Sequence, residues 1–118
     1  MTVTIYGIKT CDTVRKARNW LEGRGVEHRF VDYRVEGLDP KDLARWKGAV
    51  GWEKLLNKTS ATFKALSDAD KAGLDEKKAL ALMQVHPTLI KRPVLDVDGT
   101  ITVGFKPEIY EQAVSAGG

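Results

Sequence analysis

The stretch TVTIYGIKTCDTVRKARNWLEGRG, residues 2–25, passes from a strand pattern to a helix pattern within a few residues. Residues 2–6 alternate β-branched and aromatic side chains and stop at Gly7, which is typical of a short strand. Residues 13–23 then predict an amphipathic helix. The polar turn between the two contains Cys11, the one cysteine of the chain. We therefore begin from a strand, a cysteine turn and a helix.

The predicted helix has recognisable ends. Asp12 suits its N-cap, and Gly25 suits its stop. Its apolar face consists of Val14, Ala17 and Leu21. Residues 27–35 read as a second strand, so the chain opens with a strand–helix–strand unit. Such a unit favours parallel pairing of the two strands through a right-handed crossover.

Residues 36–87 indicate a helical block without a strand. Asp39 is a suitable N-cap for a helix ending near Val50, and EKLLN continues as a short helix. The segment SATFKAL is ambiguous, whereas DEKKALALMQV predicts a helix that Pro87 terminates.

Residues 88–118 return to strands. Two β-branched runs flank Asp98-Gly99, which predicts a hairpin with a type I′ turn, and a helix follows near Pro107. The order βαβ, helices, ββα predicts an α/β fold with a thioredoxin-like sheet and an inserted helical subdomain. We expect one domain, 1–118, in which 1–35 and 88–118 form the thioredoxin-like part and 36–87 the insertion.

The composition excludes several classes of function. Apolar residues make up 42% and charged residues 30%, and the net charge of +3 is too small for a nucleic-acid footprint. One cysteine excludes an internal disulfide, and the two histidines lie far apart, so we expect no metal. No secretory pattern or apolar run near 18 residues is present, which favours the reducing cytoplasm and excludes membrane spanning. Without a heptad pattern or a long apolar edge, we expect a monomer.

Cys11 has two interpretations. A lone cytosolic cysteine is often a small buried hydrophobe, yet the polar Lys-Thr-Cys-Asp-Thr turn at a helix start favours a reactive thiol. The helix N-terminus and the Lys9–Asp12 backbone are expected to lower the thiol pKa, and Lys9 with one or more of Arg15, Lys91 and Arg92 is expected to add positive charge. Thr13 is a candidate hydrogen-bonding partner of the sulfur. Because residues 11–14 lack a second cysteine, any redox cycle requires an external thiol.

The second candidate is the pair Arg92-Pro93 in IKRPV. A proline before a strand is ordinarily an edge or turn residue, and most arginines are solvated surface residues. In thioredoxin-like sheets, however, this position commonly holds a cis-proline that packs against the active cysteine. Arg92 would then reach an anionic substrate group with its fork of donors.

Five stretches resemble one family: TIYGIKTCDTVRKARNWLE, DYRVEGLD, GWEKLLN, IKRPVL and VGFKPEIY. They are similar, in order and spacing over nearly the whole chain, to the ArsC-type arsenate reductase family, which includes the Spx regulators. The likeness is greatest to its bacterial YffB-like branch. The resemblance implies a thioredoxin-like fold with a helical insertion and a nucleophilic Cys11.

The resemblance also implies an oxyanion site of three arginines, of which this chain keeps one, Arg92. The second position falls on Thr59, with Lys58 and Lys64 nearby, and the third on Lys106. Lysine is a compact, strongly hydrated charge and does not replace the paired donors of a guanidinium. This departure disfavours arsenate as the substrate.

The expected function is a glutathione-dependent thiol reductase that forms a mixed disulfide through Cys11. Glutathione or a glutaredoxin-like thiol is the expected co-substrate and partner. The alternatives are a non-enzymatic Spx-like adaptor that binds RNA polymerase, and an arsenate reductase. Pro93 is the expected structural residue of the site. The candidate substrate- or glutathione-binding residues are Arg92, Lys9, Thr10, Asp12, Thr13, Lys58 and Lys106.

Overall fold

The computed structural model describes residues 1–117, which form two compact units. Unit 1 consists of Met1–Gly37 and the chain from Arg92 onward, and unit 2 of Leu38–Lys91. The helical insertion expected from the sequence, 36–87, begins and ends a few residues earlier than unit 2.

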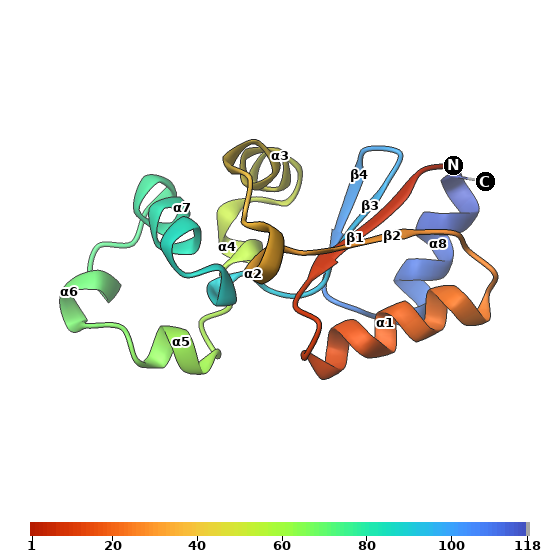
Figure 1. Ribbon diagram of the computed structural model, residues 1–118. Coiled ribbons are helices and arrows are strands. Elements are labelled where there is room, and N and C mark those ends of the chain that lie inside the picture. Colours follow the sequence, from red (N-terminus) through yellow and green to blue (C-terminus); the bar gives the residue numbers. More distant parts are fainter. Residues whose placement is uncertain (118) are drawn as a thin grey trace. The chain divides into compact units, whose positions relative to one another are not determined.

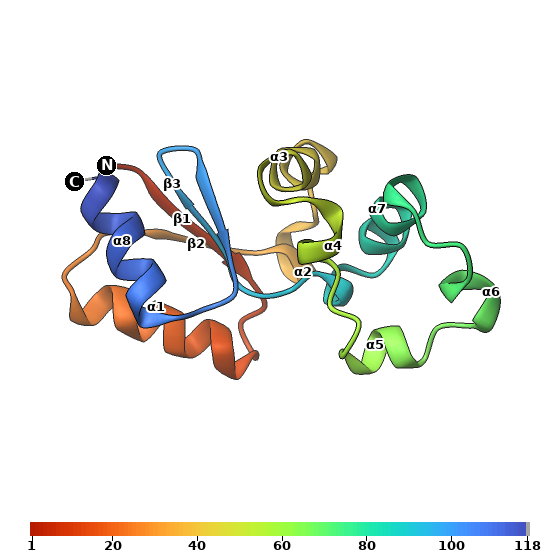
Figure 2. The same cartoon turned by 180° about the vertical axis from the view of Figure 1, so that it is seen from behind.

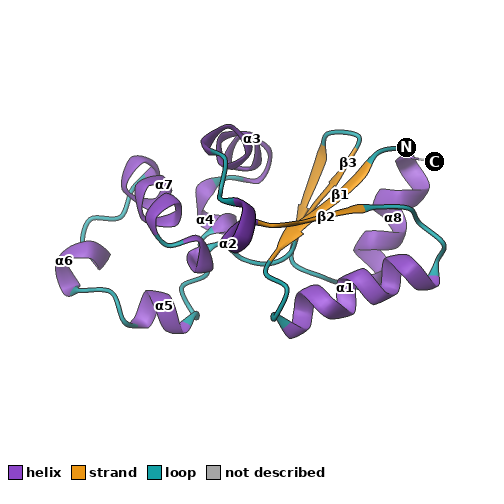
Figure 3. Ribbon diagram, viewed as in Figure 1, coloured by secondary structure: helices purple, strands orange, loops and turns teal. Residues whose placement is uncertain are grey.

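Unit 1 contains a four-stranded mixed sheet (Figures 1 and 3). Its strands are β1 (Val3–Gly7), β2 (Arg29–Asp32), β3 (Val94–Val97) and β4 (Thr100–Val103), in the order β2-β1-β3-β4. β1 pairs with β2 in parallel, and the other two pairings are antiparallel. This arrangement confirms the predicted α/β, thioredoxin-like fold.

Two helices, α1 (Asp12–Gly23) and α8 (Pro107–Gly117), cover one face of this sheet (Figures 1 and 2). The predicted apolar face of α1 is confirmed, because its members are fully buried. Ala17 and Leu21 pack with alternate residues of β1 and β3, so the two central strands and α1 share one core. The core cluster comprises Val3, Ile5, Ala17, Leu21, Leu95, Val97 and Tyr110.

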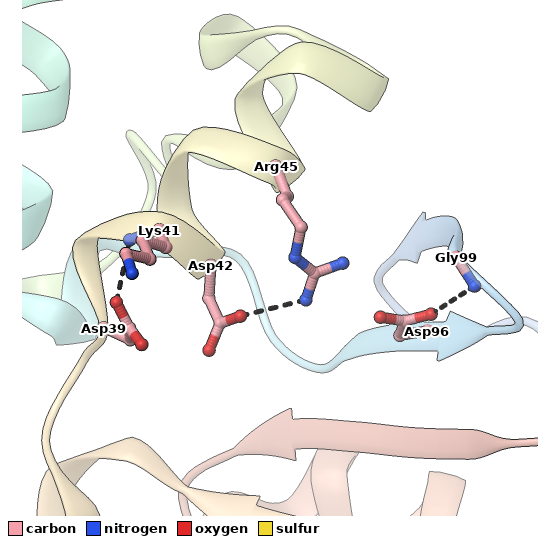
Figure 4. Close-up of polar contacts among 6 residues, drawn as sticks. All are labelled: Asp39, Lys41, Asp42, Arg45, Asp96 and Gly99. Atoms are coloured by element: carbon pink, nitrogen blue, oxygen red, sulfur yellow. Dashed lines mark hydrogen bonds and ion pairs between the residues drawn. The ribbon is translucent and has the colours of Figure 1, made fainter.

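Local signals place the ends of these elements. After α1, the N–H of Gly25 donates to the carbonyl of Glu22 and that of Val26 to Leu21, a Schellman ending in which Gly25 has φ +67°. The predicted β3–β4 turn is confirmed, with φ 52° at Asp98 and 91° at Gly99. The carboxylate of Asp96 accepts a hydrogen bond from the N–H of Gly99 at 2.8 Å (Figure 4).

The predicted second strand, 27–35, was wrong at its C-terminal end. β2 stops at Asp32, and α2 (Tyr33–Glu36) follows immediately as one helical turn. The Asp32 carboxylate accepts from the N–H of Arg34 and caps this turn, and Gly37 ends it at φ 88°, ψ 153°. The cap formed by Asp32 therefore overrides the strand preference of the β-branched and aromatic residues in this stretch.

Unit 2 is helical (Figure 3). Asp39 caps the first helix by accepting from the N–H of Lys41 at 2.9 Å, and Arg45 pairs with Asp42 on the same helix (Figure 4). The ambiguous SATFKAL segment contains a single helical turn. The helices are α3 (Pro40–Val50), α4 (Trp52–Leu55), α5 (Ala61–Lys64), α6 (Asp68–Lys71) and α7 (Glu76–Val85), followed by a 3₁₀ turn (Pro87–Leu89).

Among the described residues no helix is both long and apolar enough to cross a membrane.

Candidate active site at Cys11

Cys11 is the N-cap of α1, which corrects the assignment of Asp12 to that position. Its extended backbone, φ −79° and ψ 125°, precedes the first helical residue, and its carbonyl accepts from the N–H of Arg15 at 3.0 Å. Asp12 is the first residue of the helix, and its exposed carboxylate pairs with the Arg15 side chain. The thiol is partly exposed and so accessible to a reactant.

The pKa of the Cys11 thiol is lowered from its ordinary value. Burial is the largest single influence and raises the pKa, but the N–H of Val14, the Arg92 guanidinium and the N–H of Thr13 together outweigh it. The two N–H groups form no conventional capping hydrogen bond to the neutral thiol, yet they lie close enough to favour its ionised form. The expected influence of the helix start and of Arg92 is therefore present, but the N–H groups that act are those of Thr13 and Val14 and not the Lys9–Asp12 backbone.

The helix register explains this correction. The N–H of Cys11 is already used, donating to the carbonyl of Ile8 at 3.0 Å, and that of Lys9 donates to the Asp32 carboxylate at 2.9 Å. The groups free to face an N-cap side chain are those two and three residues further on. These belong to Thr13 and Val14.

Arg92 comes from the segment that enters β3. The Arg92–Pro93 peptide bond is cis, Pro93 is buried, and the Arg92 guanidinium lowers the pKa of the Cys11 thiol. The structure therefore brings Cys11, Thr13, Arg92 and Pro93 together within unit 1.

Tyr33 is the site residue that sequence reasoning missed. It is 2% exposed, and the Arg92 guanidinium is among the groups that influence the pKa of its hydroxyl. Burial raises the pKa of Tyr33, Arg92 opposes that rise, and a thiolate at Cys11 adds to it. The hydroxyl is therefore neutral at physiological pH. The available signal was Asp32 as an N-cap with Gly37 as a stop, which the apparent strand concealed.

The remaining candidates occupy different positions. The side chains of Lys9, Thr10 and Thr13 are exposed around the cysteine turn. Lys106 is exposed in unit 1, and its carbonyl caps α8 by accepting from the N–H groups of Ile109 and Tyr110. Lys58 is exposed in unit 2, on the turn after α4.

The turn that holds Lys58 also fixes the Thr59 hydroxyl. That hydroxyl donates to the Asn57 side-chain oxygen at 2.6 Å. Within residues 1–117 no three acidic, histidine or cysteine side chains come together as a metal site would require.

Comparisons with known proteins agree with this fold. The solved structure of the YFFB (PA3664) protein is 48% identical, covers 95% of this chain and 98% of its own, and superposes with a TM-score of 0.91. An arsenate reductase (ArsC) related protein from Brucella melitensis is also 48% identical, over 97% of this chain and 95% of its own, with a TM-score of 0.77. The global transcriptional regulator Spx 2 of Oceanobacillus iheyensis is 30% identical over 95% of this chain and 83% of its own.

The model of the ArsC family matches residues 6–113, which include the cysteine turn, the helical unit and the segment that carries Arg92. The chain belongs to the ArsC family.

Proposed function

We propose that this protein is a cytoplasmic thiol reductase that uses Cys11 as its nucleophile and glutathione as its co-substrate. The observation that carries the proposal is a partly exposed thiol whose pKa is lowered by the start of α1 and by Arg92. The thiolate is the nucleophilic form of cysteine, so this environment increases reactivity near neutral pH.

The reaction proceeds in two exchanges. The Cys11 thiolate attacks the glutathione sulfur of a protein–glutathione mixed disulfide, and the protein thiolate leaves and takes a proton from water. A second glutathione thiolate then attacks the glutathione sulfur bound to Cys11. Oxidised glutathione leaves, and the Cys11 thiolate is restored. Because Cys11 is the one cysteine of the chain, the second thiol has to come from outside.

Arg92 has two roles in this proposal. It stabilises the Cys11 thiolate before attack and after release, and its further donors bind an anionic group of the substrate. Glutathione has two carboxylates, and Arg92, Lys9 and Lys106, all in unit 1, are the proposed cationic contacts. Thr10, Asp12 and Thr13 would border the reacting sulfur.

Two alternatives make different predictions. Similarity to Spx 2 supports an adaptor that binds RNA polymerase and is modified at Cys11 without turnover. The arsenate reductase (ArsC) related neighbour supports arsenate reduction. Against that third reading, this chain has Thr59 and Lys106 where the family's further oxyanion arginines are expected, leaving Arg92 as the one matching guanidinium.

Reduction of a glutathionylated peptide by glutathione tests the proposal. We expect turnover by the wild-type protein and only the background rate with Cys11→Ser. Because the thiolate attacks, the rate should rise with pH to a plateau. The midpoint of that rise should lie below the ordinary cysteine pKa of about 8.5. Arsenate replaces the peptide in a parallel assay, and purified RNA polymerase serves as a binding probe.

Two cation variants sharpen this assay. Arg92→Ala should lower the rate near pH 6.5 by about tenfold, as expected if the thiol pKa rises by about one unit. The neighbouring exposed Lys91→Ala is the matched control and should retain the wild-type rate. No turnover above the Cys11→Ser rate with any glutathionylated peptide, together with RNA polymerase binding, would replace the reductase by the adaptor.

A further inference from the structure

A single carboxylate joins the cysteine turn, residues 8–11, to the segment that follows β2. Asp32 Oδ2 accepts from the N–H of Lys9 at 2.9 Å. Asp32 Oδ1 accepts from the N–H of Arg34 at 2.9 Å, in the helical turn α2. Gly7 and Asp32 are the final pair of the parallel ladder, so this carboxylate lies at the end that β1 and β2 share (Figure 1).

The middle of the cysteine turn gains little from packing. The N–H of Cys11 donates to the carbonyl of Ile8 at 3.0 Å, which closes the turn on itself. Such a turn leaves the N–H of its second residue, here Lys9, without an acceptor inside the turn. The side chains of Lys9 and Thr10 are exposed. The hydrogen bond to Asp32 therefore ties the middle of the turn to the sheet.

Asp32 is itself held from its backbone side. Its N–H donates to Glu36 Oε2 at 3.3 Å, and Glu36 Oε1 lies 3.8 Å from Nη2 of Arg29. Asp32 and Glu36 thus close α2 reciprocally, because each carboxylate accepts from a backbone N–H of this segment. Hydrogen bonds to a charged acceptor are about twice as strong as neutral ones, which suits a carboxylate to holding the N–H of Lys9.

We propose that Asp32 is a positioning residue of the candidate active site, whose carboxylate holds the cysteine turn at the end of β2 and so keeps the Cys11 side chain at the start of α1. The backbone conformation of Cys11, φ −79° and ψ 125°, is one in which an N-cap side chain faces the unused N–H groups of the first helical turn. This inference deepens the proposed function and rests on it for its catalytic meaning, because Cys11 is the proposed nucleophile.

The pH midpoint of Cys11 alkylation by iodoacetamide, read by intact mass, tests this role without turnover. Asp32→Asn is the informative variant, because asparagine caps helices as well as aspartate but offers one side-chain oxygen in place of two. The amide oxygen keeps the bond to Arg34, and the amide NH₂ then faces the N–H of Lys9. We expect the midpoint to rise by about 0.5–1 pH unit, which lowers the alkylation rate near pH 6.5 by about three- to tenfold.

The direction of this shift separates positioning from simple charge. Removal of a carboxylate near a thiol favours the thiolate by itself, so an effect of charge alone would lower the midpoint. A rise therefore requires that the sulfur has moved away from the groups that stabilise its anion. Asp32→Ala loses both contacts and should raise the midpoint as well. A midpoint that rises in neither Asp32→Asn nor Asp32→Ala overturns the proposal.

Asp98 offers the matched control, in the same unit and at the opposite end of β1. Its Oδ1 accepts from the N–H of Thr2 at 2.7 Å. Asp98→Asn makes the same chemical change, keeps an oxygen for this bond and should leave the midpoint unchanged. Asp98→Ala removes the bond, so it should lower the melting temperature with the midpoint still unchanged. Equal midpoint shifts in the Asp32 and Asp98 variants would show general damage and contradict the proposal.

Amide hydrogen exchange, followed by NMR, reads the two Asp32 contacts separately. In Asp32→Asn the amide of Lys9 should exchange faster and that of Arg34 at the wild-type rate. In Asp32→Ala both amides should exchange faster. A Lys9 amide that exchanges at the wild-type rate in Asp32→Ala would remove the contact on which the proposal depends.

The two proposals fail differently. A raised midpoint in Asp32→Asn, with no turnover of any glutathionylated peptide by the wild-type protein, would keep the positioning role and remove the reductase. Turnover that requires Cys11, with a midpoint raised in neither Asp32 variant, would do the reverse.

Discussion

Gly7 decides how closely α1 approaches the sheet at the reactive cysteine. A Cβ at this position would lie 2.7 Å from Cγ2 of Val14 and 3.2 Å from its Cγ1. Val14 is fully buried, and a β-branched residue in a helix has one strongly preferred rotamer, so it has little freedom to turn aside. The missing side chain of Gly7 therefore permits the position of the N–H groups that act on Cys11.

Gly7→Ala should damage both stability and reactivity. Overpacking against Val14 is expected to lower the free energy of unfolding by about 1–3 kcal/mol. Because the first turn of α1 has to move away, the Cys11 pKa should rise. Urea unfolding measures the first effect, and the pH midpoint of alkylation measures the second.

The control for this prediction lies in the same helix. Gly23 is the last residue of α1, and a Cβ there meets no atom within 4 Å. Gly23→Ala should leave the alkylation midpoint unchanged. If Gly7→Ala retained both wild-type stability and the wild-type midpoint, the close approach of α1 would have no bearing on the thiol.

At the scale of elements, α2 and α3 end in the same way. Gly37 after α2 has φ 88° and ψ 153°, and Gly51 after α3 has φ 87° and ψ 150°. This region of backbone conformation is adopted almost only by glycine. Both glycines redirect the chain, so they determine where their helices stop.

Two glycines of the α3 segment should therefore respond oppositely to alanine. Gly48 is inside the helix with open space around its Cβ position, so Gly48→Ala should raise the free energy of unfolding by roughly 0.5–1 kcal/mol. Gly51→Ala forces a strained backbone and should lower it by about 1–3 kcal/mol. Chemical denaturation of the two variants checks the signs, and equal effects would contradict the argument.

The elements whose ends depend on residues close together in the sequence were predictable from the sequence. Asp39 before Pro40 fixed the start of α3, and Asp98-Gly99 fixed the hairpin turn, because caps and turns depend on side chains a few residues apart. The end of β2 was not predictable in the same way. Asp32 could act either as a strand residue or as a cap, and the bond from Lys9 that helps fix it comes from a different strand end.

The residues of the candidate site were likewise predictable only where a local sequence pattern marks them. Cys11 and Arg92 were identified because a polar turn at a helix start and an Arg-Pro pair before a strand are visible locally. Tyr33 was not, because the influence of Arg92 on its hydroxyl pKa comes from a segment far away in the sequence. The sequence also misplaced the N-cap by one residue, which changed the N–H groups that act on the sulfur.

At the scale of the whole molecule, burial is unevenly distributed along the chain. The strands β1 and β3 and the helix α1 contain fully buried residues. In unit 2, α7 has Ala79 and Met83 buried, whereas α5 and α6 are four-residue helices without a buried residue. Segments with few buried apolar contacts open at low free-energy cost, so the molecule should have a graded stability.

Lys78 connects α6, which has no buried residue, to α7, which has two. Its ammonium donates to the carbonyl of Ala69 at 2.7 Å and to that of Ala72, and so ties the end of α6 to α7. In native-state hydrogen exchange, the amides of α5 and α6 should exchange fastest and those of β1 and β3 slowest.

Lys78→Met should accelerate exchange of the α6 amides without altering that of β1, because it removes two contacts to the turn and none to the sheet. Lys77→Met, at the neighbouring exposed position on α7, should leave the α6 rates at the wild-type value. Exchange in α6 as slow as in β1, or equal effects of the two variants, would show that contacts other than the Lys78 ammonium stabilise this segment.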